Sequence, residues 1–398
     1  MNADSRGRAP RPRPTVTHGG SDARQPARLS DRSGIGRCRR LVVKIGSSSL
    51  TDTSGRLDET RVEAIADQVA RLCAQGIDVI IISSGAIAAA LGPLGLPERP
   101  RDVATQQAAA SVGQSLLATA WSRAFGRHGR RTGQVLLTES DVIRSETYRN
   151  ARTSLEALLR LEVIPVINEN DATATHEIRF GDNDRLAALV AQLLGADLLV
   201  LLTDVDALYT APPGHPGAER LSVVADAAAV EGITIGSVGS RVGTGGMATK
   251  LAAAQHAAGT GTATVLTAAN LFGRAAAGED VGTFFPAQSG RRRSRLMWLR
   301  FATRGAGSVR IDAGAAEALR TRRRSLLAVG ITSVDGVFAG GGPVDVHDPE
   351  GTLIARGLST FGSADLRVMC GRSTGELRRE MGQEYGRPVI HRDDLVLL

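Results

Sequence analysis

The chain has 398 residues, of which 42% are apolar, so it is long enough to form two or three domains with hydrophobic cores. No apolar run reaches the roughly 18 to 20 residues of a membrane span, and the N-terminus lacks the apolar stretch of a signal peptide. The three cysteines and seven histidines are scattered, without the spacing of a disulfide framework or a zinc site. We therefore expect a cytoplasmic protein without contact to a membrane.

The net charge of +7 comes entirely from the N-terminus. Residues 1–40 contain ten arginines and three aspartates, whereas the rest of the chain holds 38 basic and 38 acidic residues. Residues 1–38 are rich in Arg, Pro, Gly and Ser and poor in large apolar side chains, which predicts a disordered tail. Non-specific attraction to polyanions and a misassigned start codon are the alternatives for this tail.

From residue 39 onward, short apolar runs alternate with amphipathic stretches, which indicates a parallel sheet with crossover helices. We expect strands at 41–46, 78–85, 133–138, 163–170, 197–210 and 262–267. We expect helices at 58–74, 101–125, 146–160, 184–194 and 247–258. The pattern predicts one three-layer α/β/α domain with a mainly parallel sheet over residues 39–295.

The alternation of apolar runs and amphipathic stretches ends at an arginine-rich stretch, and we assign residues 296–306 to a linker. Residues 307–398 contain short strand candidates separated by glycines and turns, with one helix expected at 313–320. This segment is predicted to be a small, mostly β second domain.

Ligands of an open parallel sheet bind at the carboxyl ends of its strands, where this chain places small, polar and charged residues. These residues are Lys44, Gly46, Ser47, Ser83, Ser84, Gly85, Ala86, Asn168, Glu169, Asn170, Asp171, Thr203, Asp204 and Asp206. Glycine after a strand lets backbone N–H groups approach a phosphate, and the next helix directs its positive dipole end at that anion. The turns after the first two strands fit this description and predict a phosphate site.

Lys44 and Lys250 are the only lysines, beside 46 arginines. An ammonium is a compact point charge, whereas a guanidinium is a broad planar fork, so lysine is expected where space at a phosphate is tight. Lys250 lies in the first turns of a helix that is expected to begin near Met247, directly after a glycine-rich loop. Glycines, a helix start and an ammonium thus occur together here, as they do around Lys44. The P-loop motif and the G-x-G-x-x-G dinucleotide motif are both missing.

Asp182, Asn183 and Asp184 stand directly before an apolar helix. One of them is expected to cap the helix, but three exceed that need. Such side chains can hold a substrate's amino group or a Mg²⁺ that bridges two phosphates. Two ammonium groups, backbone phosphate sites and acidic anchors together predict phosphoryl transfer.

Several longer motifs occur in a fixed order: "VVKIGSSSL", "SSGAIAAA", "VIPVINENDATAT", "GDNDRLAALVA", "VLLTDVDALYT" and "VGTGGMATKLAAA". Through them the chain resembles the amino acid kinase family, and within it the glutamate 5-kinases, over about residues 40–395. The resemblance implies phosphorylation of the side-chain carboxylate of L-glutamate by Mg-ATP, the first step of proline biosynthesis. It further implies feedback inhibition by proline and a homo-oligomer.

The resemblance also assigns roles to residues. Lys44, Lys250 and Asp184 would be catalytic, with Asp184 orienting the two lysines. Glutamate would be bound by Ser84, Gly85, Asp171, Asp182 and Asn183. The nucleotide would be bound by Lys44, Gly46, Ser47, Thr203, Asp204, Thr244, Gly245, Gly246, Met247, Ala248, Thr249 and Lys250. No protein-only metal site is expected, since ATP phosphates would hold Mg²⁺.

Residues 307–398 resemble the PUA fold, a small β barrel often found on RNA-modifying enzymes. Its arginines could contact RNA phosphates, namely Arg320, Arg322, Arg323 and Arg324. RNA binding is possible but not favoured, because the segment has almost no aromatic side chains for base stacking beyond Phe338 and Phe361. The rival hypotheses are a kinase for aspartate or a nucleoside monophosphate, and an RNA-binding regulator that kept the kinase fold.

Overall fold

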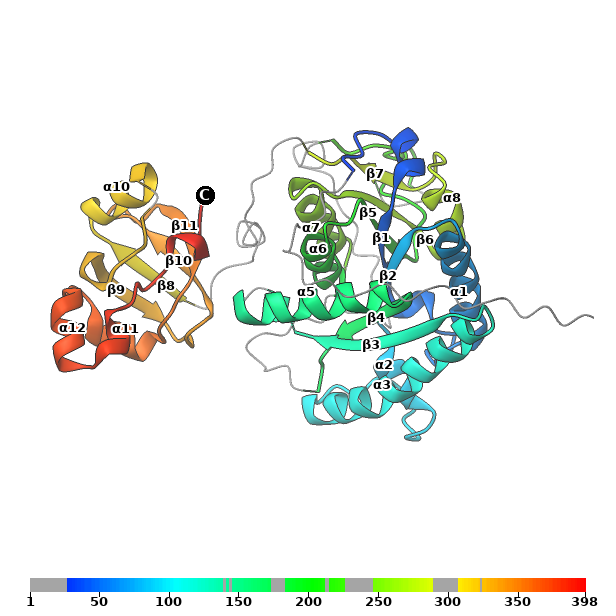
Figure 1. Ribbon diagram of the computed structural model, residues 1–398, viewed down its shortest axis with the longest axis horizontal. Helices are drawn as coiled ribbons and strands as arrows, with labels where there is room; N and C mark the ends of the chain where they lie inside the picture. Colours follow the sequence, from blue (N-terminus) through cyan, green and yellow to red (C-terminus); the bar gives the residue numbers. More distant parts are fainter. Residues whose placement is uncertain are drawn as a thin grey trace, which may run out of the picture.

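The computed structural model describes residues 27–138, 141–142, 145–172, 183–211, 215–225, 246–288, 307–322 and 324–398. These residues form a seven-stranded sheet, before residue 289, and a five-stranded sheet, after residue 306 (Figure 1). The expected linker at 296–306 lies outside the described residues. Within the part of the chain that is described, no helix is both long and apolar enough to cross a membrane.

The first sheet has the strand order β3-β4-β2-β1-β5-β6-β7. All neighbours pair in parallel except β6 and β7, which are antiparallel. The strands are β1 (Arg40–Ile45), β2 (Asp78–Ser83), β3 (Arg131–Leu137), β4 (Val163–Glu169), β5 (Leu198–Thr203), β6 (Ala263–Ala268) and β7 (Thr283–Phe285). The central strands β1 and β5 are buried at every position, as expected for a sheet covered on both faces.

Helices cover both faces of this sheet and make three layers (Figure 1). One apolar core joins a sheet face to α5 (Ser145–Arg160), α6 (Asn183–Leu194) and α7 (Met247–Gly259). The other core joins the opposite face to α1 (Glu59–Ala74), α3 (Val103–Gly126) and α8 (Phe272–Ala276). The predicted three-layer fold with a mainly parallel sheet is confirmed.

Three elements of this domain were not predicted: β7, α8 and the short helix α2 (Ala86–Leu91). Each spans six residues or fewer, so hydrophobic periodicity has too few repeats to reveal it. Gly113 of α3 explains how α2 is held, because a Cβ at Gly113 would lie 1.7 Å from the carbonyl oxygen of Ala86. Only glycine lets the two backbones approach this closely.

The N-terminal boundary differs from the prediction, because residues 27–38 are folded onto the first domain. Leu29 and Ile35 are fully buried, and residues Arg32–Arg37 form a 3₁₀ helix capped by Asp31. Arg32 donates hydrogen bonds to the backbone oxygens of Val281 and Gly282 at 2.8 and 3.0 Å. A disordered tail through residue 38 is therefore wrong for residues 27–38, while residues 1–26 lie outside the described part. The prediction of disorder rested on the overall composition of residues 1–38, but a few buried apolar side chains are enough to anchor a polar segment.

The second sheet has the strand order β12-β11-β10-β8-β9. Its strands are β8 (Gly307–Ile311), β9 (Ile331–Gly336), β10 (Pro343–His347), β11 (Leu353–Leu358) and β12 (Leu395–Leu397). β8 and β10 pair in parallel, and the other pairs are antiparallel. Three helices accompany the sheet where one was predicted: α10 (Ala313–Arg322), α11 (Ser363–Met369) and α12 (Thr374–Glu380). The two missed helices have seven residues each, and a Ser373–Glu376 capping box begins α12.

Candidate active site

The carboxyl ends of β4, β2, β1 and β5 lie side by side, because these strands are neighbours and run in parallel. Lys44 is the fifth residue of β1 and lies on the same face of the strand as Val42, toward α6. The start of α6 follows β4 in the chain, and the start of α7 packs beside α6. The fold therefore brings residues from three distant sequence segments to one edge of the sheet.

Lys44, Asp184 and Lys250 form an ion cluster at this edge. The Nζ atom of Lys44 lies 2.6 Å from Oδ1 of Asp184, and the Nζ atom of Lys250 lies 3.1 Å from Oδ2. Asp184 is completely buried, and both lysines are buried. One carboxylate thus fixes two ammonium groups side by side, and the cluster keeps one net positive charge. Buried charges of this kind are tolerated only when paired and hydrogen-bonded.

Thr249 adds a third contact to the same carboxylate. Its hydroxyl lies 3.2 Å from Oδ2 of Asp184 and 2.8 Å from the backbone oxygen of Gly246, the residue before α7. The start of α7 is therefore tied to the start of α6 through one buried side chain. Gly246 provides no side-chain hydrogen bond to the first turn of α7. Backbone N–H groups at such a helix start can bind an anion.

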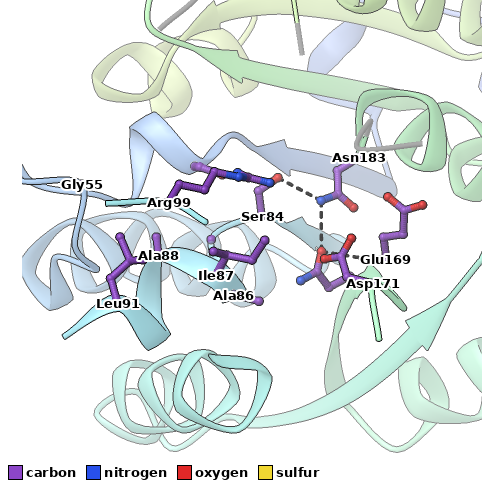
Figure 2. A pocket seen from close by; sticks show the side chains of 13 residues that line it. Gly55, Ser84, Ala86, Ile87, Ala88, Leu91, Arg99, Glu169, Asp171 and Asn183 are labelled. Atoms are coloured by element: carbon purple, nitrogen blue, oxygen red, sulfur yellow. Dashed lines mark hydrogen bonds between the residues drawn. The ribbon is translucent and has the colours of Figure 1, made fainter. Parts of the chain in front are cut away.

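A pocket opens beside this cluster, and Figure 2 shows the side chains around it. It is lined by Ser47, Gly55, Ser84, Gly85, Ala86, Ile87, Ala88, Leu91, Arg99, Asn168, Glu169, Asp171 and Asn183. Gly85 has φ +103°, a left-handed conformation that glycine adopts without strain, and it lets the chain turn sharply from β2 into α2. The pocket thus contains four of the five residues predicted to bind glutamate.

Hydrogen bonds fix the amide of Asn183 at the pocket wall (Figure 2). Its Nδ2 donates to Oγ of Ser84 at 2.9 Å and to Oδ1 of Asn168 at 3.0 Å. Oδ1 of Asn168 also accepts the backbone N–H of Glu169 at 2.9 Å. Both donor positions of the Asn183 amide are therefore used within the protein, whereas its Oδ1 is buried and has no hydrogen-bond partner among the described residues. This oxygen is suited to accept a hydrogen bond from a substrate ammonium.

Asp171 and Arg99 give the pocket opposite charges. Burial raises the pKa of Asp171, while the nearby Arg99 counteracts that rise. Burial also lowers the pKa of Arg99, while Asp171 counteracts that fall. Both shifts mean that these groups have lost part of their hydration, as expected for charges that face a ligand instead of bulk water.

The described residues predicted to bind the nucleotide lie at the ends of β1 and β5 and at the start of α7, and one of them, Ser47, also lines the pocket. Gly46 follows β1, and Ser47 begins a short 3₁₀ turn there. Thr203 is buried at the end of β5, and its hydroxyl donates to Oδ1 of the exposed Asp204 at 2.9 Å. The residues Gly246, Met247, Ala248, Thr249 and Lys250 lie at the start of α7. Asp182, Thr244 and Gly245 lie outside the described residues.

Comparison with known proteins assigns the chain to a family. Residues 39–267 match the amino acid kinase family, and residues 307–381 match the PUA domain. The chain is 54% identical to "Glutamate 5-kinase" of Salinispora arenicola (strain CNS-205) over 368 residues, which cover 92% of this chain and all of that protein. The corresponding protein of Frankia casuarinae is 55% identical over 361 residues, covering 90% of this chain and 97% of that protein.

The chain belongs to the amino acid kinase family. A further relative, "Glutamate 5-kinase" of Streptomyces coelicolor, is 52% identical over 92% of this chain and 98% of its own length. Among solved structures, carbamate kinase from Giardia lamblia bound to AMP-PNP matches 63% of this chain and 99% of that chain, with 16% identity and a TM-score of 0.47. A likeness at that level supports no inference about ligands.

Of the pocket residues of this amino acid kinase, Arg99 was not predicted, and Asn168 was predicted at a strand end but was given no role in the site. Arg99 could not be distinguished in sequence from 45 other arginines, and it lies in a loop between α2 and α3 rather than at a strand end. Asn168 ends an apolar run, and that position was the available signal. The hydrogen bond that connects it to Asn183 joins residues fifteen positions apart, which sequence alone does not reveal.

Proposed function

We propose that this protein transfers the γ-phosphoryl group of Mg-ATP to the side-chain carboxylate of L-glutamate. The observation that supports the proposal most strongly is the adjacency of the Lys44–Asp184–Lys250 cluster and the pocket of Asp171, Ser84 and Asn183. The ion cluster fits a phosphoryl group during its transfer, and the pocket fits the head group of an amino acid. Relatives of matching length that are named glutamate 5-kinase agree with this acceptor.

The reaction requires little covalent chemistry from the protein. An oxygen of the substrate carboxylate attacks the γ-phosphorus, the bond from that phosphorus to the bridging oxygen breaks, and ADP leaves with the electron pair. The products are an acyl phosphate and ADP, and no proton has to be removed from the nucleophile. Catalysis therefore depends on positioning and on charge neutralisation. Lys44 and Lys250 supply the positive charge, and Asp184 positions both.

The substrates divide between the two sides of the ion cluster. Asp171 and Oδ1 of Asn183 would hold the glutamate ammonium, so the side chain points toward Lys44. The nucleotide would lie along Gly46, Thr203, Asp204 and the start of α7, and the ATP phosphates would hold Mg²⁺. In this arrangement the two reactants meet at the lysines.

The rest of the proposal concerns regulation and partners. Proline, an amino acid with the same head-group charges, would compete for the glutamate pocket, and the protein would act as a homo-oligomer in the cytoplasm. RNA binding by the PUA domain is not favoured. Phe338 and Phe361 are both buried in its core, so neither presents a stacking surface, and Arg320 is paired with Asp348 at 2.8 Å.

ADP release with Mg-ATP and a panel of acceptors tests the proposal. The panel contains L-glutamate, L-aspartate, N-acetylglutamate and UMP, and hydroxylamine traps any acyl phosphate as a hydroxamate. We expect ADP and hydroxamate with L-glutamate alone. Turnover of another acceptor would assign the kinase to that acceptor, and no turnover with any acceptor would favour the RNA-binding regulator.

A further inference from the structure

The pocket contains one positively charged side chain, Arg99, among the residues that line it. In Figure 2 its guanidinium is directed toward the part of the pocket where Ser84 and Asn183 lie. It reaches there from the segment between α2 and α3, not from the strand ends that supply the other polar residues. In the proposed phosphoryl transfer, Arg99 has no role in binding ATP or in positioning the two lysines.

An L-α-amino acid presents two charges at its head group, an ammonium and a carboxylate. Asp171 and the buried Oδ1 of Asn183 match the ammonium, but the negative group needs a donor of its own. Lys44 and Lys250 are held by Asp184 at the phosphoryl side and face the other end of the substrate. A guanidinium binds a carboxylate through two parallel N–H···O bonds, which suits it to this position.

We propose that Arg99 binds the α-carboxylate of the amino acid substrate and, with Asp171, selects the acceptor by its zwitterionic head group. The inference rests on the proposed function, since it assigns one further contact in the same pocket. The partial dehydration of both side chains, seen in the direction of their pKa shifts, agrees with this role. Both side chains line the same pocket, and each affects the pKa of the other, so Arg99 lies near the carboxylate that would bind the ammonium.

Three acceptors that differ in their head-group charges show what each charge contributes to kcat/KM. L-Glutamate has both charges, 4-aminobutyrate lacks the α-carboxylate, and glutarate lacks the ammonium. In R99A we expect kcat/KM to fall roughly 10- to 100-fold for L-glutamate and glutarate and to stay unchanged for 4-aminobutyrate. In D171N we expect kcat/KM to fall for L-glutamate and 4-aminobutyrate and to stay unchanged for glutarate. Assays at pH about 8.5 keep Asp171 ionised in the wild type and in R99A.

Arg101→Ala is the matched control, because Arg101 lies in the same segment and is exposed. It should leave all three kcat/KM values unchanged, and Arg99→Lys should restore part of the glutamate activity. An equal fall for all three acceptors in R99A would assign Arg99 a structural role and overturn the proposal. So would an unchanged KM for L-glutamate in R99A. If the wild type does not phosphorylate L-glutamate at all, the proposed function itself fails, and that result is visible before any variant is made.

Discussion

The ammonium of Lys44 lies 2.6 Å from Oδ1 of Asp184, a carboxylate with no exposed surface, at the edge of the central sheet. The other oxygen of the same carboxylate lies 3.1 Å from the ammonium of Lys250. One residue near the start of α6 therefore sets the spacing of two cations from β1 and α7. This spacing decides whether both can contact one phosphoryl group.

Lys250→Arg should lower kcat by about 100-fold or more while ATP still binds. The buried site beside Asp184 holds a compact ammonium, and a planar guanidinium would displace the carboxylate or the phosphate. Steady-state kinetics and nucleotide titration measure the two effects separately. Near-normal kcat would remove Lys250 from the catalytic group.

Asp184→Asn should destabilise the fold as well as abolish turnover. The change leaves two buried ammonium groups without their counter-charge, which costs about 3 to 5 kcal/mol in free energy of unfolding. Chemical denaturation followed by circular dichroism gives this value. Glu59→Gln is the control, because its pair with Arg123 is exposed and its loss should cost less than about 1 kcal/mol. Equal destabilisation by the two changes would contradict the assigned burial of the Asp184 cluster.

The KM for L-glutamate should rise as the pH falls toward the raised pKa of Asp171. The ionised carboxylate binds the substrate ammonium, and burial makes this carboxylate take up a proton at a higher pH than an ordinary aspartate does. Above the raised pKa, KM should be level. A pH series of glutamate KM tests this, and D171N should show a raised KM with a flatter profile. A wild-type KM that rises only near pH 4 would contradict the raised pKa.

Acid should destabilise the protein through His256. This side chain is buried beside Gln192, with its Nε2 atom 2.9 Å from Oε1 of Gln192, and burial lowers its pKa to about 3. A histidine whose pKa falls on folding stabilises the protein above its unfolded pKa of about 6.5, and that stability is lost as the pH falls below this value. Between pH 7 and 5 the loss should be about 2 kcal/mol.

Chemical unfolding at the two pH values measures this loss, and His256→Gln should reduce it. The control is His128→Gln, because His128 is partly exposed and its Nε2 atom lies 2.7 Å from Oδ1 of Asp67 at the surface. Equal pH dependence of stability in wild type and His256→Gln would contradict the prediction.

Arg32→Ala should lower the free energy of unfolding by about 1 to 3 kcal/mol. Its guanidinium donates hydrogen bonds to four backbone oxygens, those of Ser222, Glu279, Val281 and Gly282, and lies 5.5 Å from the ring centre of Phe284. Arg37→Ala is the control, since Arg37 is exposed in the same 3₁₀ helix. If both variants unfold like the wild type, residues 27–38 contribute no stability.

The sequence predicted six of the seven strands of the first sheet and its long helices, because each shows a buried apolar run or an amphipathic repeat. It also placed Lys44, Asp184 and Lys250 at one edge, since strand ends and helix starts of a parallel sheet meet there. The prediction from sequence failed for features that depend on contacts between residues far apart in the chain. Leu29 is buried by contacts with distant segments of the chain, and Arg99 reaches the pocket through a loop whose course no periodicity describes. Gly113 is explained only by the backbone of Ala86 lying against it.

The central claim is that a substrate carboxylate attacks the γ-phosphorus of ATP. The most direct measurement uses L-glutamate labelled with ¹⁸O in its side-chain carboxylate, with Mg-ATP and hydroxylamine. Hydroxylamine attacks the carbonyl carbon of the acyl phosphate and releases phosphate with the attacking oxygen attached. We predict inorganic phosphate that carries one ¹⁸O atom for each hydroxamate formed. Phosphate without ¹⁸O would show that water, not glutamate, accepts the phosphoryl group, and would contradict the account.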